Sequence, residues 1–217
     1  PVPPISFKYG SKGNQIALLM AVLVGGVESE RFTYDSIGRL TSKTLRSAEG
    51  NWPIATINYG YDSLDRLVAI EYPRRSDTAR DPRIKIGMSY DLQGQLTTIS
   101  NEYSQYLSGV DYDAAGRIVS ARVGSEGANQ IVESNHFDSA SGLLLRQLVS
   151  RNSTNLLDVT YGYTSNQNRR TNQVTRVDNN GLSTHRSFYN YDSWGRLIES
   201  YDGPDFEQMY TARAYTY

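Results

Sequence analysis

The sequence predicts an all-β protein built from tandem antiparallel β-hairpins. A seven-residue phrase recurs at near-constant spacing, and the residues that precede it alternate between apolar and polar side chains. The chain also prefers tyrosine to phenylalanine, with 17 tyrosines and five phenylalanines among 217 residues. Tyrosine suits a half-buried strand, because its ring packs while its hydroxyl reaches water or a polar partner.

The repeated phrase begins with Tyr-Asp. Its five full copies are YDSIGRL at Tyr34, YDSLDRL at Tyr61, YDLQGQL at Tyr90, YDAAGRI at Tyr112 and YDSWGRL at Tyr191. Weaker copies start at Tyr9, Phe137 and Tyr163, and Tyr217 stands where another would begin; successive copies are 22 to 29 residues apart. A period in this range indicates a repeat array. Residues 1–217 are therefore predicted to form one array of about eight hairpin units.

The apolar run from Ile16 to Val24 is predicted to be a buried strand. Its nine residues are too few for a membrane helix, which needs about 20. It also lacks the basic leader of a signal peptide. A helix remains the alternative, because residues 17–21 are all good helix formers.

A strand is predicted directly before each full copy of the phrase, with its alternate residues on one face. Phe32 and Tyr34 are two residues apart with Thr33 between them, which is the period of a half-buried strand. The same spacing recurs in the pairs Tyr59–Tyr61, Met88–Tyr90, Val110–Tyr112, Tyr161–Tyr163, Tyr189–Tyr191 and Tyr215–Tyr217.

The four residues after each tyrosine predict a tight turn. Aspartate favours the first position of a type I turn, because its carboxylate accepts bonds from the following amides, and glycine at the fourth adopts the left-handed conformation that closes a bulged hairpin. This pattern occurs at Asp35–Gly38, Asp91–Gly94, Asp113–Gly116 and Asp192–Gly195. The turn at Asp62 has Asp65 in place of glycine, and the turn from Asp138 to Gly142 has one extra residue.

A long polar residue and a branched apolar one open each return strand. These pairs are Arg39-Leu40, Arg66-Leu67, Gln95-Leu96, Arg117-Ile118 and Arg196-Leu197. We expect the arginines to pair with the turn aspartates or to cover the aromatic ladder with their stems.

Other segments are predicted to connect the repeats. Residues 71–83, with Pro73 and Pro82, and residues 124–133 are predicted to be loops. The turn signal from Asp178 to Gly181 predicts an additional hairpin between residues 174–177 and the strand near Phe188. Because a lone hairpin is marginal in water, the units are expected to stack side by side. The open terminal edges are expected either to cause self-association or to be capped.

The phrase Y-D-x-x-G-R-L on this period resembles the YD or Rhs repeat, over about Tyr9 to Tyr217. That repeat occurs in bacterial Rhs and wall-associated polymorphic toxins, in the B and C components of insecticidal Tc toxin complexes, and in animal teneurins. The resemblance implies a β-sheet strip that spirals into a hollow shell, of which this chain would be a partial segment. The shell encloses a cleaved C-terminal toxin in the bacterial proteins and serves cell–cell adhesion in teneurins.

Bacterial members of the family end in a self-cleaving segment rich in Asp-Pro-Gly phrases. This chain contains no such phrase, and it starts and stops within a repeat. The resemblance therefore implies a piece of a larger protein, secreted or on a bacterial cell surface. Its expected partners are the rest of its own parent chain and an enclosed toxin polypeptide, with any self-cleavage or toxin activity outside this segment.

The repeated residues have a second interpretation as a binding site. A row of aspartates suggests calcium or carbohydrate binding, and a row of tyrosines suggests stacking on sugar rings. Calcium needs six to eight converging oxygens, however, and turn formation already accounts for one aspartate per repeat. No cofactor or metal is expected: there is no cysteine, and His136 and His185 have no acidic residue at ligand spacing. With 22 basic and 23 acidic side chains, nucleic acid is not an expected partner either.

Two functions thus remain from the sequence. One is a structural shell segment of a toxin-delivery protein, and the other is an extracellular adhesion or carbohydrate-binding module that contacts glycans or proteins. No motif supports an enzyme, since neither a nucleophile elbow nor a phosphate-binding glycine loop is present.

Overall fold

The structure, a computed structural model, describes residues 2–47, 53–73, 83–164, 171–178, 181, 183–203 and 210–216. These residues form 17 β-strands and one short 3-10 helix, so the prediction of an all-β fold of antiparallel hairpins is confirmed. The chain divides into two compact units, residues 1–91 with 99–103 and residues 92–98 with 104–217. Strand β8 (Leu96–Ser100) has residues in both.

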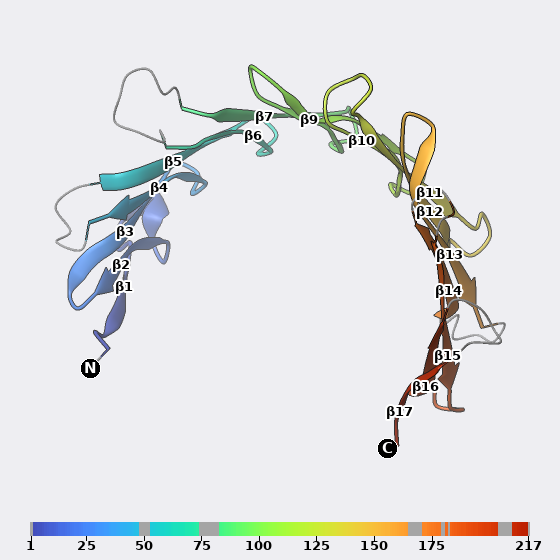
Figure 1. The fold of residues 1–217 in the computed structure, drawn as a ribbon. Helices are drawn as coiled ribbons and strands as arrows, with labels where there is room; N and C mark the ends of the chain where they lie inside the picture. The colour runs from blue at the N-terminus through green and yellow to red at the C-terminus, as the bar shows by residue number, and fades with distance from the viewer. Residues whose placement is uncertain are drawn as a thin grey trace. The chain divides into compact units, whose positions relative to one another are not determined.

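The first unit is an antiparallel meander, in which each strand from β1 to β6 pairs with the next one along the chain (Figure 1). Its strands are β1 (Ile5–Tyr9), β2 (Leu19–Val24), β3 (Val27–Tyr34), β4 (Leu40–Arg46), β5 (Pro53–Tyr61), β6 (Leu67–Glu71) and β7 (Lys85–Tyr90). The 3-10 helix η1 (Gly13–Gln15) lies in the connection between β1 and β2.

The second unit repeats this meander from β9 to β17. Its strands are β9 (Gln105–Tyr112), β10 (Ile118–Val123), β11 (Ile131–Phe137), β12 (Leu144–Arg151), β13 (Thr154–Tyr163), β14 (Thr171–Asp178), β15 (Ser183–Tyr191), β16 (Leu197–Gly203) and β17 (Tyr210–Ala214). The additional hairpin predicted around residues 178–181 is confirmed, because β14 pairs with β15 and Gln173 lies opposite Phe188.

The two faces of the first unit differ in chemistry. Side chains alternate between the faces of a strand, so residues opposite one another in the register share a face. One face carries apolar side chains in register, with Phe32 and Ile57 on either side of Lys43, and Tyr59, Ile70 and Ile86 in adjacent strands.

The opposite face carries hydroxyls that bond to one another. The Thr33 Oγ1 lies 2.7 Å from the Ser42 Oγ, and the Thr44 Oγ1 lies 3.0 Å from the Thr56 Oγ1. Across the described residues of both units, only four apolar side chains are buried, and these are Ala21, Leu23, Val110 and Val159. Most of the apolar side chains therefore lie in a single layer and remain partly exposed.

The buried strand predicted over Ile16–Val24 begins later, at Leu19, and only Ala21 and Leu23 in it are buried. Ile16 lies in the connection before it, where Ala17 has a left-handed φ of 63° and the Gly10 amide donates to the Leu18 carbonyl. The helical alternative for this segment was wrong. Hydrogen bonding to β1 and β3 on both sides holds residues 19–24 extended, although residues 17–21 favour a helix.

The bounds of the two predicted loops differ from those expected. Glu71 belongs to β6 and lies opposite Lys85, while residues 131–133 belong to β11 and pair with β12. The charged stretch between Pro73 and Pro82 lies outside the described residues, as does the copy starting at Tyr217.

Candidate functional site

The repeated aspartate organises the turn that follows it. Asp35 Oδ1 accepts hydrogen bonds from the backbone amides of Ile37 at 3.0 Å and Arg39 at 2.9 Å. The Asp35 amide donates to the Arg39 carbonyl, and Gly38, at φ 89°, donates to the Asp35 carbonyl. The same carboxylate bonds recur at Asp62, Asp113 and Asp192.

The arginine of each repeat binds the aspartate of its own turn. Arg39 Nε donates to Asp35 Oδ2 at 2.6 Å, and equivalent bonds of 2.7 Å join Arg66 to Asp62 and Arg117 to Asp113. The Arg117 side chain, followed by its backbone amide, lowers the pKa of Asp113 below the ordinary value. The carboxylate is thus held in its charged form.

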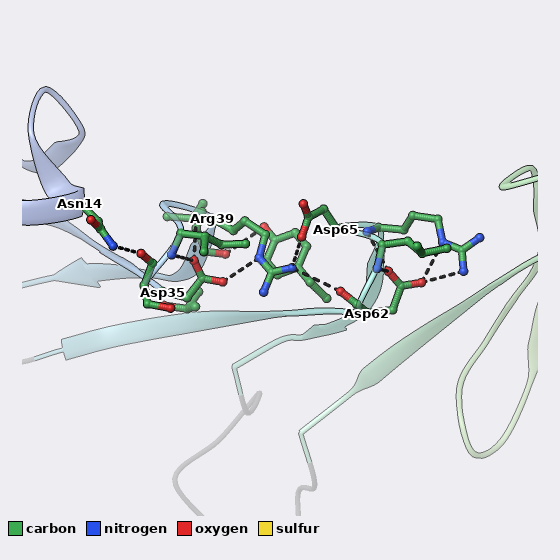
Figure 2. A network of polar contacts seen from close by, with 12 residues as sticks. Asn14, Asp35, Arg39, Asp62 and Asp65 are labelled. Carbon is green, nitrogen blue, oxygen red and sulfur yellow. Dashed lines mark hydrogen bonds and ion pairs between the residues drawn. The ribbon is translucent and has the colours of Figure 1, made fainter.

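The same arginine also reaches the next repeat, as Figure 2 shows for Arg39. Arg39 Nη1 donates to the Asp62 carbonyl at 3.3 Å and to Asp65 Oδ1 at 2.5 Å. Its guanidinium lies 4.9 Å from the centre of the Tyr61 ring, a cation–π distance. Arg66 continues the pattern toward Tyr90 at 4.8 Å.

The tyrosine hydroxyl makes the link in the opposite direction. Tyr61 donates to the carbonyl of Leu40, the apolar residue that ends the preceding phrase, at 2.9 Å. Burial raises the pKa of Tyr61, so the hydroxyl keeps the proton that it donates. The same kind of bond joins Tyr34 to Leu19, Tyr90 to Leu67, Tyr112 to Leu96, Tyr163 to Leu144 and Tyr191 to Thr171, at 2.6 to 2.8 Å.

We call this arrangement the repeat junction: the arginine and the last apolar carbonyl of one phrase with the tyrosine and turn of the next. It brings together the aspartates, glycines and tyrosines that the sequence singled out. Sequence reasoning missed that the arginine and the tyrosine each contact a neighbouring repeat. The signal was the constant spacing of five residues from tyrosine to arginine.

The junction at Phe137 departs from the pattern. Phe137 has no hydroxyl, and the Asn135 amide nitrogen donates to the Ile118 carbonyl instead, at 3.3 Å. The same nitrogen also donates to Glu133 Oε1 at 3.3 Å, and no donor among the described residues reaches the buried Asn135 Oδ1. An open groove of about 570 Å³ lies here, and its lining includes Phe137 and Arg117.

A left-handed backbone favours the glycine that ends a turn, and this position also lies against the preceding repeat. A Cβ on Gly142, which has φ 74°, would lie 2.9 Å from Nη1 of the Arg117 side chain in the preceding phrase. Asp65 takes the same left-handed conformation with φ 64°, and its carboxylate contacts Arg39 rather than displacing it. The glycine position therefore contacts the preceding repeat as well as closing its own hairpin.

The weaker copies behave differently from one another. Tyr163 makes the full hydroxyl bond to the preceding strand although no aspartate follows it. Tyr9 is 60% exposed, and nine residues connect β1 to β2, whereas five connect β3 to β4. The repeated phrase alone does not predict that Tyr163 makes the hydroxyl bond while Tyr9 remains exposed.

Neither a group of metal-ligating side chains nor a membrane-spanning helix is present in the part of the chain that the structure describes. No three histidine, cysteine, aspartate or glutamate side chains gather there as metal ligands. Nor does that part of the chain hold a helix long and apolar enough to cross a membrane.

The solved structures that resemble this fold include two of TcdB2–TccC3 complexes. The crystal structure of TcdB2–TccC3–Cdc42 aligns with a TM-score of 0.59 at 13% identity, over 91% of this chain and 12% of that chain. The crystal structure of TcdB2–TccC3 gives a TM-score of 0.58 at 14% identity, with the same coverage. The chain has the fold of these Tc toxin components. The resemblance to the YD-repeat proteins is thereby confirmed at the level of fold.

The Tc toxin chains are much longer, and this chain spans only 12% of their length. A Photorhabdus luminescens Tc holotoxin pore also aligns, over 95% of this chain and 14% of that one, at 14% identity and a TM-score of 0.47. No protein-family model matches the sequence, and no curated protein does.

Proposed function

We propose that this chain is a structural wall segment of a secreted Tc-like toxin-delivery protein, in which a shell of YD repeats encloses a polypeptide passenger. The repeat junction is the observation that carries this proposal. Asp35, Arg39 and Tyr61 are all engaged in bonds within or between repeats, so the repeated residues serve to join hairpins. Catalysis is not the role of this segment, and a toxin or self-cleaving activity belongs to other parts of the parent protein.

The exposed sheet supports the same role. The apolar face with Phe32, Ile57 and Ile70 is not covered by a second layer of the described residues. Extended apolar surfaces of this kind mark contact sites for other polypeptides. In the proposed shell, this face contacts the passenger or another part of the parent chain.

The proposal is tested on the parent protein purified from its producing cells with an antibody against this segment. Proteinase K should leave a passenger polypeptide intact while the shell is closed, and electron microscopy should show density inside a wall. The paired variant Tyr61→Phe with Tyr90→Phe weakens two junctions and should speed digestion of the passenger. Tyr9→Phe alters an exposed ring and serves as the control.

Either of two results would contradict the proposal. One is a parent protein that holds no second polypeptide and no internal density. The other is a passenger that is digested at the same rate in the intact protein and after the shell has been opened with denaturant.

A further inference from the structure

Strand β1 leaves one backbone edge of the first unit open. Among the described strands of this unit, β1 pairs with β2 (Figure 1). The Pro4 carbonyl accepts a hydrogen bond from the Gly25 amide at 2.8 Å, and the Gly10 amide donates to the Leu18 carbonyl at 2.9 Å. Because successive residues of an antiparallel strand bond to opposite sides, the even-numbered residues of β1 face β2. The amides and carbonyls of residues 5, 7 and 9 therefore point toward the open edge.

The side chains of these three residues are apolar and exposed. Ile5, Phe7 and Tyr9 are 62%, 56% and 60% exposed. Phe32, which holds the place of Phe7 in β3, is half-buried because β3 is paired on both sides. Charged side chains commonly protect an open edge from pairing, but Lys8 is the one charged residue of β1 and lies on its other face. The apolar side of this edge is thus unprotected.

The open ladder is short and symmetric. Pro3 has no amide hydrogen to donate, and beyond Tyr9 the Gly10 amide is already bonded in the connection to β2. The open ladder therefore runs from Ile5 to Tyr9 and is centred on Phe7. A helix satisfies its own backbone groups, so the partner that fills this ladder is a strand.

We propose that β1 pairs antiparallel with β1 of a second copy of this chain, about a two-fold axis through Phe7. Phe7 then lies opposite Phe7 of the second copy and Ile5 lies opposite its Tyr9, so every edge position forms an apolar pair. Lys8 lies opposite Ser6 of the second copy, and no like charges face one another. Because the axis is perpendicular to the sheet, both apolar faces lie on the same side of one continuous sheet.

A return strand from another repeat is the alternative occupant, and the connection after Tyr9 disfavours it. At the repeat junction Arg39 reaches the Asp62 carbonyl and the Asp65 carboxylate of the next turn. The connection after Tyr9 has Gly10 in place of the aspartate and carries Lys12. An incoming arginine would therefore meet a cation where the other junction offers a carboxylate, and such like-charge contacts reject a partner. A second β1 brings no arginine.

The test is sedimentation velocity of the whole chain from low to high micromolar concentration. A five-residue edge buries much less than the ~1,200 Å² of a stable interface, so wild type should shift from monomer to dimer as concentration rises. Phe7→Lys places two lysines opposite one another on the axis and should raise the dimer dissociation constant at least tenfold. Leu45→Lys is the matched control, because Leu45 is 41% exposed but its strand β4 is paired on both sides. Circular dichroism checks that each variant keeps its strands.

Cross-linking tests the register, because the chain has no cysteine. With the pairing centred on Phe7, the Cα atoms of the two copies of residue 7 lie about 5.5 Å apart, within reach of a disulfide. Those of residue 6 lie about 8 Å apart, which is beyond that reach. Under mild oxidation Phe7→Cys should therefore form a linked dimer much faster than Ser6→Cys.

Four results would overturn the proposal. The first is a chain that stays monomeric at every concentration, and the second is a dimer that Phe7→Lys leaves unchanged. The third is equal cross-linking of Phe7→Cys and Ser6→Cys, which would contradict the register. The fourth is a monomeric chain that binds a peptide of residues 39–46, because the edge would then belong to a neighbouring repeat.

Discussion

Removing one tyrosine hydroxyl should loosen one repeat junction by a measurable amount. Tyr61→Phe keeps the ring beneath Arg39 but deletes the 2.9 Å bond to the Leu40 carbonyl. A typical intramolecular hydrogen bond contributes about 1 kcal/mol net. Because about 1.4 kcal/mol is a factor of ten, local opening of the sheet between β4 and β5 should become roughly fivefold more frequent.

Hydrogen–deuterium exchange of peptides from β4 and β5 measures this opening directly. The amides of both strands should exchange about fivefold faster in Tyr61→Phe, while Tyr9→Phe, at an exposed ring, should leave exchange unchanged. The reverse substitution, Phe137→Tyr, should slow exchange in β10 and β11, because the new hydroxyl reaches the Ile118 carbonyl that Asn135 now contacts at 3.3 Å. If Tyr61→Phe and Tyr9→Phe exchange alike, the hydroxyl does not couple the repeats.

Three further predictions concern the other parts of the junction. The pKa of Asp62 lies below the ordinary value, mainly because the backbone amide of Arg66 donates to its carboxylate. The bonds that lower this pKa stabilise the fold above about pH 4, and their contribution is lost when acid protonates the carboxylate. The urea midpoint should therefore fall between about pH 5 and pH 3, and it should fall less in Asp62→Asn. Arg39→Ala should lower the urea midpoint at pH 7. Arg39→Lys should restore only part of this loss, because an ammonium lacks the planar guanidinium geometry that lets Arg39 bond to two turns. Full recovery by lysine would mean that charge alone matters. Gly142→Ala should destabilise the chain to urea more than Gly124→Ala does. Both glycines have positive φ, but only Gly142 lies against Arg117. Equal losses of stability would show that backbone strain is the whole effect.

The sequence was sufficient for the local structure of each repeat. Alternation around Phe32 and Tyr34 and the turn chemistry of Asp35 depend on residues within a few positions, and all of these can be seen in the printed phrase. The start of β2 was missed because Ala17 takes a left-handed backbone that its side chain does not favour. Pairing to β1 and β3 then decides where the strand begins.

The links between repeats could not be predicted in the same way. Tyr61 and its acceptor on Leu40 are 21 residues apart, and the bond forms only once the two hairpins lie side by side. Tyr163 takes part although its phrase is weak, because the hydroxyl needs only a ring in the right register and a carbonyl in the strand before it. Pairing of distant strands, rather than the local phrase, decides which copies join the array.

The two links at each junction run in opposite directions along the chain, and this gives the array an order of assembly. Arg39 and the Leu40 carbonyl belong to one hairpin, and together they make the contacts that bind Tyr61 and the turn of the next hairpin. A ribosome delivers the earlier hairpin first. Each new hairpin can therefore dock on the finished hairpin before it as soon as it emerges, so the array of hairpins can grow one unit at a time before synthesis of the chain ends.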